Sequence, residues 1–154
     1  NHPYVFFSEE VIKNDSIDFE ALEQAVAREL SVFPGISIAI GSTLLRRGNV
    51  PDTDLHDAVL KNFHPKRSGD IYVVFEPNMF INDFDGLTVA STHGSPWPYD
   101  TWVPVVFAGA GIASDRVMRK IYTTDVARTL SAYMGVKPPS GSVGEVLEEV
   151  FQDD

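Results

Sequence analysis

The sequence predicts a layered α/β domain, and three observations support this prediction. Apolar residues make up 44% of the 154 residues and charged residues 22%, which is typical of globular chains. Strand-like and helix-like apolar patterns follow one another along the chain. Their order begins strand, helix, strand, helix, strand, which favours strands and helices packed in layers. A chain of this length buries a real core, so we expect residues 1–154 to form a single domain.

The first half of the chain contains two well-marked helix starts. Asp18 is a good N-cap, with Ile17 and Leu22 at the two positions of a hydrophobic staple. Asp52 or Thr53 caps the second helix. The expected elements are strands at residues 4–7, 36–40 and 71–75, and helices at about 18–31 and 53–63.

The second half opens with a long irregular stretch at residues 77–102, and a loop of that length is usually functional or disordered. Its aromatic side chains argue against simple disorder. A strand is expected at residues 103–107, and Thr124 caps a helix that stops at Gly135. A short final helix is expected at about 146–151. The inward-facing residues of the helix after Thr124 are predicted to be Val126, Ala127, Leu130 and Met134.

The charge balance and the absence of cysteine exclude several kinds of function. The chain has 12 basic and 22 acidic side chains, a net charge of −10, which argues against nucleic acid as a partner. A phosphorylated substrate stays possible, because a bound metal reverses the local sign of charge. No apolar run reaches the roughly 20 residues of a membrane helix, so no membrane partner is expected. Without cysteine there is neither a disulfide nor a thiolate metal site.

The first residues indicate a chain taken from something longer. The sequence starts close to a strand-like run and lacks both an initiating Met and a charged-then-apolar signal. We therefore expect further chain before residue 1.

The densest cluster of chemically active side chains lies at residues 91–95, shortly before Asp100. His93 follows Thr92 and precedes Gly94 in a predicted loop. Imidazole binds zinc well, glycine permits close approach of the backbone, and Asp100 lies near enough to orient the ring. The alternative is an ordinary surface histidine in a hydroxyl-rich turn, which the spacing alone favours.

Three ordered motifs resemble a signature of the alkaline phosphatase superfamily. The similarity covers about residues 69–150 and is greatest to bacterial single-chain zinc phosphatases related to nucleotide pyrophosphatases and phosphodiesterases. The motifs are residues 92–95 with 99–101 and 103–109, then 123–130 up to Gly135, and then 139–142 followed by Gly144 and Leu147.

The resemblance implies the C-terminal portion of an alkaline phosphatase-like fold, with a mixed sheet and flanking helices. It implies two zinc ions and a Thr or Ser that forms a covalent phosphoryl intermediate. His93 matches the last histidine ligand of one zinc, and Asp100 and Thr92 would support that ligand from behind. The nucleophile and the other ligands lie upstream in the family. We therefore expect no catalytic residue in this chain, no tight zinc binding and no activity of the chain alone.

The substrate and the compartment follow only from the resemblance. A phosphate monoester is slightly favoured, and export to the periplasm or beyond is implied. The alternatives are a phosphodiesterase or nucleotide pyrophosphatase of the same superfamily, or a non-catalytic α/β interaction module. The oligomeric state is left open.

Other candidate side chains have simpler explanations. His2, His56 and His64 match no motif and are expected to be solvated or structural. The basic pairs Arg46–Arg47 and Lys66–Arg67 more often serve helix ends than bind phosphate. The aromatic residues expected to pack the loop onto the sheet, rather than to line a pocket, are Trp97, Tyr99 and Trp102.

Overall fold

The computed structural model describes residues 4–81, 91–112 and 114–151 of the chain. Its contacts divide the chain into two compact units, residues 1–102 and residues 103–154, which we call unit 1 and unit 2. Each unit is described by itself. The expectation of a single domain stays a prediction.

Unit 1 is built on a three-stranded antiparallel sheet. The strands are β1 (Tyr4–Val5), β2 (Ile36–Gly41) and β3 (Ile71–Phe75), in the order β1-β3-β2. Tyr4 lies opposite Tyr72 across the first pair. The α/β class and the three strand positions are confirmed, although β1 is shorter than predicted. The strands described here pair only in the antiparallel direction.

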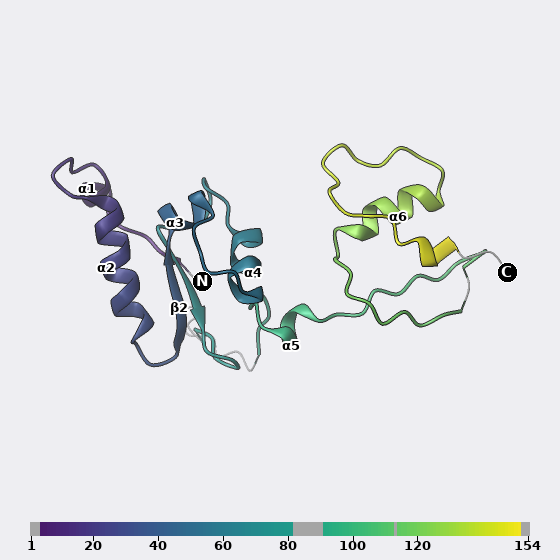
Figure 1. Cartoon of the computed structure of the whole chain (residues 1–154), viewed down its shortest axis with the longest axis horizontal. Coiled ribbons are helices and arrows are strands. Elements are labelled where there is room, and N and C mark those ends of the chain that lie inside the picture. The colour runs from purple at the N-terminus through teal and green to yellow at the C-terminus, as the bar shows by residue number, and fades with distance from the viewer. Residues whose placement is uncertain (1–3, 82–90, 113, 152–154) are drawn as a thin grey trace. The chain divides into compact units, whose positions relative to one another are not determined.

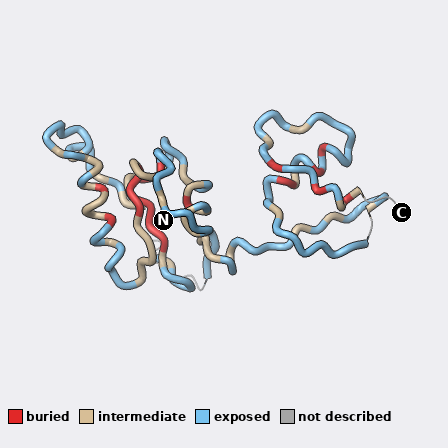
Figure 2. The backbone as a smooth tube through the Cα atoms, viewed as in Figure 1, coloured by how far each residue is buried: buried red, intermediate tan, exposed pale blue. Residues whose placement is uncertain are grey.

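Helices cover both faces of this sheet. Helix α2 (Phe19–Ser31) packs on one face, and α3 (Ser42–Arg47) with α4 (Asp54–Asn62) packs on the other (Figure 1). Side chains of β3 alternate between the two layers because successive residues of a strand point to opposite faces. Buried residues concentrate along the strands (Figure 2). One cluster joins Ile71 and Val73 to Ala27, and the other joins Tyr72 and Val74 to Ile40, Leu45 and Val59.

The predicted helix starts are confirmed by their capping bonds. The Asp18 carboxylate accepts the Ala21 N–H at 3.0 Å, and the Thr53 hydroxyl accepts the His56 N–H at 3.3 Å. Each bond satisfies a donor that the first turn of a helix leaves free. The short helix α1 (Glu9–Ile12), which precedes α2, was not predicted.

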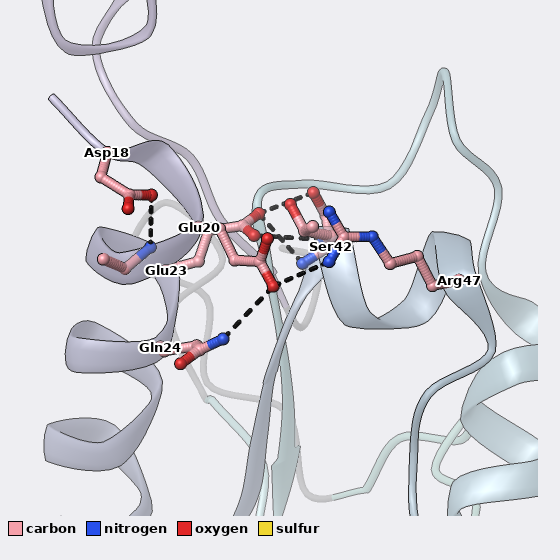
Figure 3. Close-up of polar contacts among 8 residues, drawn as sticks. Asp18, Glu20, Glu23, Gln24, Ser42 and Arg47 are labelled. Carbon is pink, nitrogen blue, oxygen red and sulfur yellow. Dashed lines mark hydrogen bonds and ion pairs between the residues drawn. The ribbon is translucent and has the colours of Figure 1, made fainter.

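Helix α3 was also missed, because its cap comes from a residue distant in the sequence. Glu23 of α2 is only 1% exposed. Its carboxylate accepts the Ser42 hydroxyl at 2.7 Å and the Ser42 and Thr43 N–H groups at 3.1 Å (Figure 3). The N-cap of α3 is Gly41, where a Cβ would lie 2.9 Å from Cβ of Glu23. A side chain there would push away the carboxylate that replaces an ordinary cap.

A second polar link joins α2 to α3 at the surface. Arg47 donates to the Glu20 carboxylate at 2.9 Å, and Gln24 donates to the same oxygen at 3.4 Å (Figure 3). Both partners of the ion pair reach solvent, so this link contributes little beside the buried Glu23 bonds.

Unit 2 is held together by buried polar groups. Its elements are α6 (Asp125–Tyr133) and the 3₁₀ helix η1 (Glu148–Phe151). The Asp125 carboxylate accepts the Tyr122 and Glu145 N–H groups at 2.8 and 2.9 Å. The Thr129 hydroxyl accepts the Leu147 N–H at 3.0 Å and donates to the Asp125 carbonyl. These bonds tie the segment before η1 to one side of α6.

Two predictions in unit 2 are wrong. Residues 103–107 are not a strand in the described chain, because a strand needs a hydrogen-bonded neighbour and no described residue pairs with them. The predicted inward face of α6 is also wrong. Leu130 is 42% and Met134 62% exposed, whereas Asp125 and Thr129 are buried against the segment before η1. The final helix begins at residue 148 instead of 146.

Candidate functional site

A cavity of about 340 Å³ lies in unit 1 beside β3. Residues 72–75 of β3 form one wall, residues 78–81 a second, and the loop at residues 91–96 a third. Tyr99 and Asp100 complete the lining. The loop predicted to be functional therefore lines a cavity against the best-buried strand of the sheet.

Two aromatic side chains fix the loop against β3 and the turn after it. The Trp97 indole N–H donates to the Phe75 carbonyl at 2.9 Å, and the Tyr99 hydroxyl accepts the Asn78 N–H at 2.9 Å. Trp97 is also packed against the core cluster that contains Tyr72. The short helix α5 (Pro98–Thr101) begins directly after Trp97.

The aromatic residues of this loop take different roles. Packing onto the sheet is confirmed for Trp97. Tyr99 both anchors the loop and lines the cavity, so the two alternatives apply to it together. Trp102 is 81% exposed, so the packing prediction is wrong for this residue.

His93 lies in the loop wall of the cavity with Thr92, and both residues are exposed. Gly94 follows with a φ of 105°, a conformation that side chains rarely adopt. A Cβ on Gly94 would meet nothing within 4 Å. Backbone conformation, rather than crowding, therefore requires glycine beside the imidazole.

Asp100 lines the same cavity and is held by the loop itself. Its carboxylate accepts the Ser95 N–H at 2.9 Å. The neighbouring Ser95 hydroxyl, then this N–H, and more weakly the charge of His93 lower the pKa of Asp100 below its ordinary value. The hydroxyl makes no hydrogen bond of good geometry among the described residues, so its effect on Asp100 is one of proximity. The fold thus brings Thr92, His93 and Asp100 to one cavity, with Asp100 as a fixed negative charge.

The opposite wall is less polar and was not identified from the sequence. It contains Met79, Phe80 and Ile81 beside β3. Tyr72 also borders the cavity, and burial raises the pKa of its hydroxyl, which accepts a hydrogen bond from Asn62 at 2.7 Å. The signal that could have found this wall is its position, because these residues directly follow the most buried strand.

The other histidines and basic pairs lie apart from this lining. The His56 ring Nδ1 lies 2.7 Å from the Thr53 hydroxyl, and the His64 ring accepts the Lys66 N–H at 3.2 Å. These local bonds confirm the structural interpretation of His56 and His64, while His2 lies outside the described residues. The basic pairs Arg46–Arg47 and Lys66–Arg67 do not border the cavity either.

The described residues contain no group of three or more His, Asp or Glu side chains placed to hold a metal ion. Among the helices of the same residues, none combines the length and apolar character needed to cross a membrane.

Comparison with known proteins gives relatives over nearly the whole chain. No family model matches the sequence. Alkaline phosphatase PhoV of Synechococcus elongatus is 25% identical over 148 residues, which are 96% of this chain and 26% of that protein. A Myroides odoratus protein named calcium-transporting ATPase is 27% identical over 148 residues, with the same two coverages.

A solved structure agrees with these sequences. The crystal structure of alkaline phosphatase PafA matches with a TM-score of 0.77 and 26% identity, over 97% of this chain and 28% of that chain. The chain thus spans about a quarter of the length of the relatives that it matches. By sequence and by fold, it belongs to the alkaline phosphatase superfamily.

Proposed function

We propose that this chain supplies part of the active site of a longer zinc-dependent phosphomonoesterase, with His93 as a ligand of one of two zinc ions. The observation that carries the proposal is the shared cavity of Thr92, His93 and Asp100, in a chain similar to alkaline phosphatases. A monoesterase is the specific form of the hydrolase that these relatives suggest.

The donor set fits one ligand of such a centre. The His93 side chain is exposed, Gly94 leaves its surroundings open, and the Asp100 carboxylate lies in the same cavity. A catalytic zinc ion takes about three protein ligands, so the others belong to chain outside these 154 residues. Bound zinc would stabilise negative charge on phosphate oxygens.

The chain's own residues prepare this position. The Ser95 N–H holds Asp100, and the attraction between Asp100 and His93 favours one orientation of the ring. The Thr or Ser that would carry the phosphoryl group lies outside this chain in our proposal, so the chain alone is inactive. The longer protein would act in the periplasm or outside the cell.

Substituting His93 in the longer enzyme tests the proposal. His93→Ala should remove one equivalent of bound zinc and most of the hydrolysis of 4-nitrophenyl phosphate. Asp100→Asn should cost less, roughly 10- to 100-fold in zinc affinity, because it acts through the histidine. His64→Ala is the matched control and should keep both properties. Full zinc content and activity in His93→Ala would remove His93 from the site.

The isolated chain gives a second test. Calorimetry with zinc alone should show binding weaker than micromolar, as expected of an incomplete ligand set. Micromolar or tighter binding that is lost in His93→Ala would contradict the incomplete site. In the longer enzyme, faster hydrolysis of bis(4-nitrophenyl) phosphate than of the monoester would turn the assignment to a phosphodiesterase.

A further inference from the structure

Unit 2 exposes apolar residues where a folded unit normally buries them. Only Leu147 and Val150 are buried apolar residues among its described positions. Val103 and Val106 are 57% and 82% exposed, and much of the unit 2 backbone is coloured as exposed in Figure 2. Exposed apolar surface of this extent marks an interaction site.

The first part of this surface is the segment 103–107, Val-Pro-Val-Val-Phe. A near-continuous apolar run is typical of a strand buried on both faces of a sheet. Within the described chain, its N–H groups make no hydrogen bond to any residue. The segment therefore combines strand-forming composition with a backbone that is free to pair.

The second part is the apolar side of α6. Val126, Leu130 and Met134 lie four residues apart and form one stripe along the helix. Leu130 and Met134 are largely exposed, while the polar residues Asp125 and Thr129 face the segment before η1. An amphipathic helix that shows its apolar stripe to solvent lacks a neighbour on that side.

We propose that residues 103–107 and the apolar stripe of α6 form a docking surface for the remainder of a longer phosphatase chain, which adds a strand beside residues 103–107. The inference rests on the proposed membership in a longer protein. In the relatives, the matched region is about 26% of the length, so a large body of chain is present to cover this surface.

A second copy of the chain is a poorer occupant. Each copy has a net charge of −10, and two such copies repel one another. The remaining occupant would be residues 1–102 of the same chain. The experiment separates all three.

Amide hydrogen exchange should be compared between the 154-residue chain and the longer protein that contains it. In the chain alone, amides of residues 105–107 should exchange within about tenfold of unstructured rates, and in the longer protein at least roughly 100-fold more slowly. Protection in the monomeric chain alone would assign the surface to residues 1–102. Protection that rises with concentration, together with a dimer, would assign it to a second copy. Either result overturns the proposal, as does a native protein of only 154 residues or fast exchange in both proteins.

A pair of variants tests the helix stripe. Leu130→Asp in the longer protein should speed exchange at residues 105–107 by roughly tenfold or more, since it places a charge in the docked face. Ala132→Asp is the matched control, because Ala132 is exposed and lies about 160° around α6 from Leu130. In the chain alone, neither variant should change this exchange. Equal effects of the two variants in the longer protein would remove the stripe from the docking surface.

These readouts are independent of catalysis. A longer protein without phosphatase activity but with protected residues 105–107 would end the proposed function and keep the docking surface. An active enzyme with fast exchange there would do the reverse.

Discussion

The two units of this chain are stabilised in different ways. In unit 1, a sheet lies between helices, and eight of the ten buried apolar residues in the described chain belong to it. In unit 2, buried polar groups hold α6 to the segment before η1, and the apolar stripe of the helix faces outward. The comparison teaches that the unit with the cavity has its own core, whereas the unit with most of the family motifs lacks one.

The largest expected effect is the loss of a core side chain in unit 1. Ile71 is fully buried between β1 and β2, so Ile71→Ala should lower the free energy of unfolding by about 2–5 kcal/mol. Urea unfolding followed by Trp fluorescence measures this change. Ile12→Ala, at a position 51% exposed, is the control and should have a small effect. Similar losses in the two variants would contradict an apolar core in unit 1.

A smaller effect is expected in unit 2, from a polar group. Thr129→Val keeps the shape of the side chain but leaves the buried Leu147 N–H without its acceptor, which should cost about 1–3 kcal/mol. The loss should appear as faster amide exchange in α6 with unchanged exchange in β3. Thr123→Val, at an exposed position just before α6, is the control. Faster exchange in both units at once would show that they open together, and would remove the distinction between them.

The smallest expected effect is a pH dependence at the surface of unit 2. A hydrogen bond from Arg119 lowers the pKa of Glu149 below its ordinary value. A lowered pKa in the folded state means that the pair stabilises above the ordinary glutamate pKa, and that this contribution is lost as the pH falls through the lowered value. Both side chains reach solvent, so the contribution is small.

Removing the cation tests this assignment. Arg119→Gln should return the pKa of Glu149 toward its ordinary value, as measured by NMR titration of the side-chain carboxyl. Arg116→Gln is the control, because Arg116 is an exposed arginine of the same unit. An unchanged titration of Glu149 in Arg119→Gln would mean that the pair does not form in solution.

Much of unit 1 could be predicted because its signals are local. Asp18 and Thr53 cap helices within three residues of themselves, and the runs at residues 36–40 and 71–75 form strands wherever a sheet accepts them. Helix α3 could not be predicted, since its cap, Glu23, lies 19 residues from Ser42.

The errors in unit 2 have a related cause. The pattern of residues 103–107 is that of a strand and the pattern of α6 is that of an amphipathic helix, but a pattern does not say whether a neighbour is present. Propensity and periodicity are properties of one segment, whereas strand pairing and burial are properties of two.

The sequence by itself determined the family, the position of His93 beside a glycine, and the elements whose caps and apolar periods are local. Only the tertiary structure decided that His93 and Asp100 share a cavity with the end of β3, that Glu23 is buried, and that α6 turns its polar side inward. The physical reason is the range of the interactions. Capping and periodicity act over a few residues, but a cavity wall or a buried carboxylate depends on groups that only folding brings together.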